Sequence, residues 1–143
     1  MCVVAVVGGL GLVVAGGCST GQTGLPGVEV VAAEGESAIR IEADWADVEA
    51  AVTAALGQSE LVRVRLDRPD PSQVVYALRT SRDEPATLTI ARLDGPGALD
   101  PVRLRLVCRV GRFGDAAREG EFLALVADRL RQLRGVEVAP LRE

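Results

Sequence analysis

A strand that runs through a glycine-punctuated corner into an amphipathic helix, at residues 102–133, most constrains what this chain can fold into. The first part alternates apolar side chains with arginines, the pattern of a strand with one buried face. Two glycines then interrupt the pattern where positive φ is expected, and Asp115 follows as a candidate helix cap. Apolar residues recur at helical spacing from Phe122 to Leu133, so this helix is predicted to cover the core with one face.

The preceding segment predicts one more helix and a run of short strands. Asp44 is a candidate cap for an amphipathic helix at 45–56, which Gly57 can end. Alternating runs at 61–66, 74–78 and 87–91 follow, separated by turns rich in Pro, Asp and Gly. Connections this short favour antiparallel neighbours. With a short strand at 38–42, the sequence predicts an α+β fold of order β-α-β-β-β-β-α, an antiparallel sheet of four or five strands with both helices on one face.

The first 37 residues predict an export signal and a tether. Residues 1–17 are uncharged and almost wholly small or aliphatic, which suits the apolar region of a secretory signal peptide better than a bilayer span of about 20 residues. Residues 18–37 are rich in Gly, Ser, Thr and Glu, which indicates a flexible tether with a reach of roughly 20 to 25 Å. Within this segment, residues 28–32 are also compatible with a short edge strand. We place the folded domain at 38–135, and 136–143 is either a tail or a last edge strand.

The sequence VAGGC at 14–18 resembles the lipobox of bacterial lipoproteins. The resemblance implies that Cys18 is diacylated and becomes the mature N-terminus, so that a lipid holds the protein to a membrane. Ser19, in place of aspartate, suits sorting to the periplasmic face of the outer membrane if the cell is Gram-negative. Two alternatives are an ordinary signal peptide cut near the same place and an uncleaved hydrophobic anchor.

The corner sequence RVGRFGDAAREGEFLALVADRL, at 109–130, resembles a family of small bacterial lipoproteins of unknown function. Their last strand ends in an Arg-Val-Gly-x-Phe-Gly-Asp signature before the final helix. The matching residues are Arg109, Val110, Gly111, Phe113, Gly114 and Asp115. The resemblance extends over about 39–133 and implies fold and location, but it brings no known activity.

The corner has two interpretations. A glycine-rich turn at a helix start can bind an anion through free N–H groups. We favour an architectural role for Gly111, Phe113, Gly114 and Asp115, in which the aspartate caps the helix and the phenylalanine packs over the sheet edge. No P-loop lysine or Rossmann glycine triplet supports a phosphate site.

The composition argues against several classes of function. The net charge is −4 and all 16 basic residues are arginines, which disfavours nonspecific nucleic-acid binding. The chain has no histidine, and its three cysteines lack the spacing of a zinc or redox motif. Nucleophilic catalysis would lack a histidine base. We therefore expect no enzyme, no metal and no cofactor.

The remaining candidate site is a set of arginines that alternate with apolar residues along the predicted strands. They would share the sheet face opposite the helices: Arg63, Arg65, Arg79, Arg103, Arg105 and Arg109. Guanidinium groups favour carboxylates and phosphates, although cross-strand pairing with Asp and Glu would make this face an ordinary solvated surface. The sequence thus predicts a membrane-anchored, non-catalytic envelope accessory with a possible envelope protein as partner. The alternative is a soluble periplasmic module that binds an anionic ligand or acidic partner on the arginine-rich face.

Overall fold

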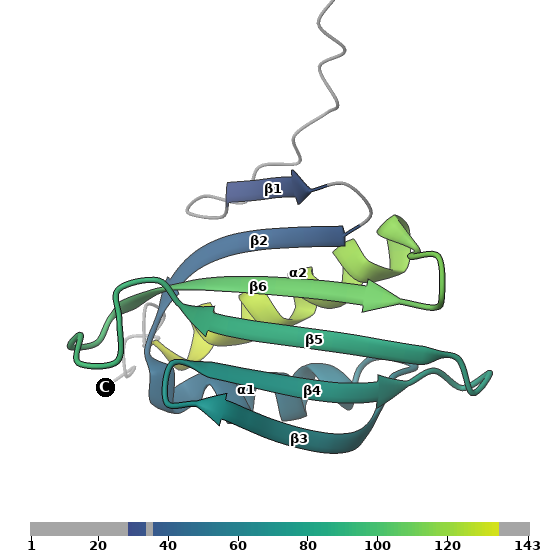
Figure 1. Ribbon diagram of the computed structural model, residues 1–143, viewed down its shortest axis with the longest axis horizontal. Helices are drawn as coiled ribbons and strands as arrows, with labels where there is room; N and C mark the ends of the chain where they lie inside the picture. The colour runs from purple at the N-terminus through teal and green to yellow at the C-terminus, as the bar shows by residue number, and fades with distance from the viewer. Residues whose placement is uncertain (1–28, 34–35, 135–143) are drawn as a thin grey trace, which may run out of the picture.

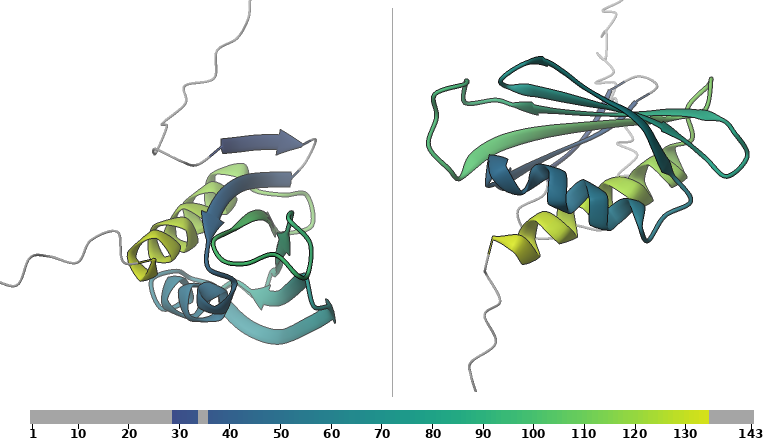
Figure 2. Two further views of the ribbon diagram at one scale, coloured as in Figure 1. Left: turned by 90° about the vertical axis from the view of Figure 1, so that its left-hand side faces the viewer. Right: turned by 90° about the horizontal axis from the view of Figure 1, so that it is seen from below.

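Two helices pack on one face of a six-stranded antiparallel sheet in the computed structural model, which describes residues 29–33 and 36–134 (Figures 1 and 2). The strands are β1 (Glu29–Ala33), β2 (Glu36–Ala43), β3 (Val62–Asp70), β4 (Gln73–Arg79), β5 (Pro85–Arg92) and β6 (Val102–Val110). A 3-10 turn η1 (Trp45–Asp47) leads into α1 (Val48–Leu56), and α2 (Ala116–Leu133) follows β6. From β2 onward this is the predicted order, so the α+β fold class is confirmed.

The sheet order β1-β2-β6-β5-β4-β3 places β6 inside the sheet, between β2 and β5. Its alternate side chains, including Leu104 and Leu106, are fully buried against the helices. Phe122 and Val126 of α2 and Val52 of α1 meet them in one core. Leu133, expected on the apolar face of α2, is 37% exposed because it lies at the end of the helix.

The strand β1 lies in the segment predicted to be a tether. It pairs antiparallel with β2, with Val31 opposite Ala38, and β2 itself begins at Glu36. The sheet therefore extends upstream of the predicted domain boundary at residue 38, since the backbone of β1 pairs with an edge of β2 that would otherwise be open. The predicted signal at 1–17, Cys18 and the segment 136–143 lie outside the described residues.

The edge strand β3 departs from the predicted alternation. The pairing register with β4 shifts between Arg63 and Arg65, so Val64 is an extra residue in a bulge. Arg63 pairs with Leu78, whose side chain faces the helices, and Arg65 faces the other way. The expected buried face of this strand is lost, and Val62 and Val64 are 63% and 61% exposed.

Candidate functional site

A buried carboxylate closes the corner between β6 and α2. Glu119 is 2% exposed, and its Oε1 accepts hydrogen bonds from the N–H groups of Val110 and Asp115, both at 2.9 Å. Its Oε2 accepts from the N–H and hydroxyl of Ser37, at 3.3 and 2.8 Å. One side chain thereby joins the end of β6, the start of α2 and the start of β2.

Burial and hydrogen bonding act in opposite directions on this carboxylate. Burial alone raises the pKa of Glu119, but its backbone and serine donors together hold that pKa below its ordinary value. The side chain is therefore ionised at neutral pH. Burial, with a smaller contribution from Glu119, raises the pKa of the Cys108 thiol to about 12, so this buried cysteine is a neutral thiol and a poor nucleophile.

The corner turns through two glycines with positive φ, 76° at Gly111 and 81° at Gly114. The side chain of Asp115 then accepts a hydrogen bond from the N–H of Arg118 at 3.2 Å and caps α2. Phe113 does not pack over the sheet edge as predicted, because it is 90% exposed. Its expected role in fixing the corner belongs to Glu119.

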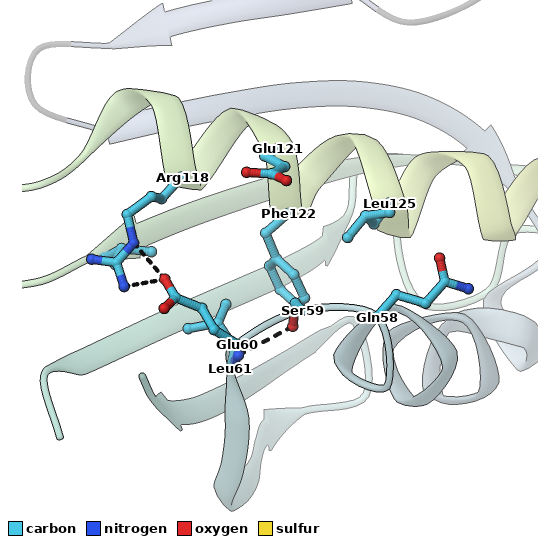
Figure 3. Close-up of a pocket in the computed structure, with 9 residues that line it drawn as sticks. Gln58, Ser59, Glu60, Leu61, Arg118, Glu121, Phe122 and Leu125 are labelled. Atoms are coloured by element: carbon cyan, nitrogen blue, oxygen red, sulfur yellow. Dashed lines mark hydrogen bonds and ion pairs between the residues drawn. The ribbon is translucent and has the colours of Figure 1, made fainter. Parts of the chain in front are cut away.

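An ion cluster and a cavity lie beside the corner (Figure 3). The guanidinium of Arg118 pairs with Glu60 and, at 2.9 Å, with Glu84. The cavity, about 280 Å³, is lined by Gln58, Ser59, Glu60, Leu61, Val110, Arg118, Glu121, Phe122 and Leu125. Because two carboxylates already engage Arg118, the cavity offers no free cation for an anionic ligand.

A second cavity of about 200 Å³ lies at the start of α1, where Trp45 and Tyr76 are among the lining residues. The hydroxyl of Tyr76 is buried and has no hydrogen-bond partner in the part of the chain that the structure describes. Burial, and to a smaller degree the charge of Glu49, raises the pKa of Tyr76 to about 12. This phenol is therefore neutral at physiological pH and unsuited to act as a base.

Both described helices lie on one side of the sheet, so neither covers the opposite face (Figure 2). Five of the six predicted arginines lie on that open face. Strand register places there Arg65, Arg79, Arg103, Arg105 and Arg109. The bulge in β3 turns Arg63 to the helix face, where its guanidinium lies 3.7 Å from the carboxylate of Glu49. Arg40, which was not identified from the sequence, alternates with Ile39 and Ile41 in β2 and lies on the same open face.

Acidic neighbours neutralise part of this open face. The ion pairs Arg65–Asp67, Arg79–Asp83 and Arg103–Asp94 have N–O distances of 2.7, 2.6 and 2.5 Å. By contrast, Arg105 makes no hydrogen bond or ion pair with any described residue. Arg109 donates only to the carbonyl oxygen of Arg112, at 3.1 Å. The unneutralised charge is therefore concentrated on β6.

Arg105 lies directly opposite Arg40 across the β2–β6 pair. Like charges at directly opposite positions destabilise a sheet. Arg105 has no acidic partner among the described residues, and guanidinium groups bind carboxylate and phosphate oxygens through paired hydrogen bonds. Arg105 is therefore the strongest candidate for an anion contact on the open face.

No family model matches the chain, and no curated protein matches it significantly. Within residues 29–33 and 36–134, no group of three or more Cys, Asp or Glu side chains is arranged to hold a metal ion. Neither helix described is long and apolar enough to cross a membrane.

Replacing Glu119 by Ala should destabilise the protein more than replacing Asp115 by Ala. The first change leaves three N–H groups and one hydroxyl without their acceptor, at a cost of about 3 kcal/mol or more. The second removes one helix cap, at a cost of about 1 kcal/mol. Urea unfolding of both variants beside the unmodified chain measures the difference, and equal losses would contradict the role given to Glu119.

The contribution of Glu119 should also depend on pH. Since its folded pKa is below the ordinary 4.5, the carboxylate stabilises the fold fully above that value, and the stabilisation is lost as pH falls through the folded pKa. The stability difference between the unmodified chain and Glu119→Gln should shrink when pH drops from 7 to 3. Urea unfolding across this range provides the measurement, and a constant difference would refute the assignment.

Proposed function

We propose that this protein is a lipid-anchored, non-catalytic accessory domain of the bacterial cell envelope, related to the small lipoproteins that its corner resembles. Cys18 carries the lipid and, in a Gram-negative cell, holds the domain at the periplasmic face of the outer membrane. The open sheet face contacts an acidic partner, such as another envelope protein. The observation that carries the contact is that Arg105 makes no hydrogen bond or ion pair with any described residue, on a face that no described helix covers.

Four side chains at the corner, the cavities and the core that could perform chemistry are occupied or neutral, which supports a non-catalytic role. Glu119 is used to hold the corner, and Arg118 is engaged by two glutamates. Cys108 and Tyr76 have pKa values of about 12 and are protonated at physiological pH. The chain has no histidine to act as a general base near neutrality.

The anchor supports the contact energetically. Two acyl chains hold a protein firmly to a bilayer, whereas one binds only marginally. A domain concentrated at one surface can recognise a neighbour through a few surface ion pairs, even though each contributes little on its own. Arg105 and Arg109 suit this kind of weak, charge-directed contact.

The anchor is tested by intact-mass analysis of the protein extracted from membranes. We expect a mature chain that begins at Cys18 and carries the mass of a diacylglyceryl group. A Cys18→Ala variant should lose its membrane partition because it lacks the acceptor thiol. An unmodified N-terminus, or a variant that stays wholly with membranes, would contradict the anchor.

The open face is tested with an oligoglutamate peptide as the acidic probe. Arg105→Ala should weaken binding by on the order of tenfold at low salt, since one charge-assisted hydrogen bond contributes about 1.5 kcal/mol. Arg63→Ala, which removes the same side chain from the helix face, is the matched control and should bind as the unmodified chain does. Titration calorimetry at two salt concentrations measures both variants.

Equal binding of the peptide by Arg105→Ala and Arg63→Ala would show that the open face is not the binding surface.

The two tests together also distinguish the lipid-anchored protein from the soluble alternative. If Cys18 is unmodified while the Arg105 effect is found, the protein is a soluble periplasmic module that binds acidic ligands. That outcome is favoured by the same guanidinium of Arg105 and needs no lipid.

A further inference from the structure

The loop at the corner is firmly held but presents its apolar side chain to solvent. One oxygen of Glu119 binds the N–H groups of Val110 and Asp115, which bracket the loop on both sides. Inside the loop, the guanidinium of Arg109 donates to the carbonyl oxygen of Arg112 at 3.1 Å. Phe113 nevertheless is 90% exposed, the most exposed large hydrophobic side chain of the described residues.

A loop fixed by hydrogen bonds that still exposes a phenylalanine is not explained by packing within the domain. A hydrophobic side chain on a frayed loop is ordinary, since single exposed apolar residues are common on protein surfaces. Here the two ends of the loop are fixed by a buried carboxylate, and two glycines with positive φ set its path. The fold therefore holds Phe113 out in a defined place.

We propose that the tip formed by Arg112 and Phe113 is a second membrane contact, in which the ring enters the headgroup boundary of an anionic bilayer. Arg112 is exposed and makes no hydrogen bond or ion pair with its side chain among the described residues. An aromatic ring beside guanidinium groups matches this boundary, where apolar and anionic groups meet. Arg109, at the base of the loop, adds a second positive charge.

The position of the tip fits a tether at Cys18, so this inference rests on the proposed lipid anchor. Ser37 at the start of β2 is bonded to Glu119 of the corner and pairs with Cys108 near the end of β6. Figure 1 shows the start of β2 and the β6–α2 connection at the same end of the sheet. The tip therefore lies at the end of the sheet where β2 begins.

The length of the tether allows the contact. Ten residues, 19–28, separate Cys18 from β1, and ten extended residues span up to about 33–36 Å. Glu29 pairs with Arg40, which is three residues from Ser37, or roughly 10 Å along the strand. The anchored domain can thus bring its tip to the surface that holds the lipid. Because tethering raises the effective concentration of the surface, a contact too weak to bind alone suffices.

The test places a tryptophan at the tip and measures its depth in the membrane. The chain from Cys18 onward, which contains every described residue, is coupled through the Cys18 thiol to a maleimide lipid. The vesicles contain phosphatidylglycerol and brominated acyl chains, which quench nearby indoles. Coupling selects Cys18 because Cys108 is buried. All proteins carry Trp45→Phe, so that the introduced indole is the sole reporter.

Phe113→Trp is expected to lose half or more of its fluorescence in these vesicles relative to unbrominated ones. Leu99→Trp is the matched control, since Leu99 is 89% exposed but belongs to the β5–β6 connection and adjoins Asp100. Its fluorescence should change by less than a tenth. Adding Arg112→Ala to Phe113→Trp should roughly halve the quenching, because it removes a charge that anionic headgroups attract. Replacing the phosphatidylglycerol by a zwitterionic lipid should halve the quenching of Phe113→Trp for the same reason.

Absence of quenching in Phe113→Trp, or equal quenching at both positions, would overturn the membrane contact. The first result would mean that a protein partner or solvent, and not lipid, meets the tip. Chemical coupling makes this result independent of whether cells acylate Cys18. The anchor itself stands or falls on the mass of the cellular protein, so the two failures are distinguishable.

Discussion

The four hydrogen bonds of Glu119 are the interaction on which the rest of this structure depends. They join the end of the central strand, the start of the helix that covers it and the start of the strand next to it. A buried carboxylate without partners would be protonated or destabilising. Here its donors come from three segments that are brought together only by folding, so the charge is tolerated only in the native arrangement. The side chain therefore ties local geometry at the corner to the correct pairing of β2 with β6.

Local patterns were sufficient to predict most of the fold. Alternation in β4, β5 and β6, and helical spacing in α2, each identify a buried face without knowledge of the neighbours. Glu119 could not be predicted in this way, because its partners include Ser37, 82 residues earlier in the chain. The sequence did contain one signal. In the usual capping box a glutamate lies three residues after the helix cap, and Glu119 lies four residues after Asp115.

The candidate site shows the same limit. Strict alternation assigned Arg63 and Arg65 to one face, but the bulge at Val64 separates them, and a bulge leaves no mark in the hydrophobic pattern. The strand β1 was left as one of two possibilities, because its residues suit a strand but its polar, glycine-containing context suits a tether. Arg40 was missed because its importance arises only from register, which sets it opposite Arg105. Pairing between strands is non-local information, and the arginine face depends on it.

The two faces of the sheet are under different physical constraints. The helix-facing side is packed with side chains whose loss would leave cavities, so its residues are fixed by stability. The open face is not packed against either described helix, and its surface ion pairs contribute little to stability. The fold therefore does not fix the identity of a solvated residue such as Arg105. The proposed acidic partner would give Arg105 a role, as the proposed lipid contact would for the exposed ring of Phe113.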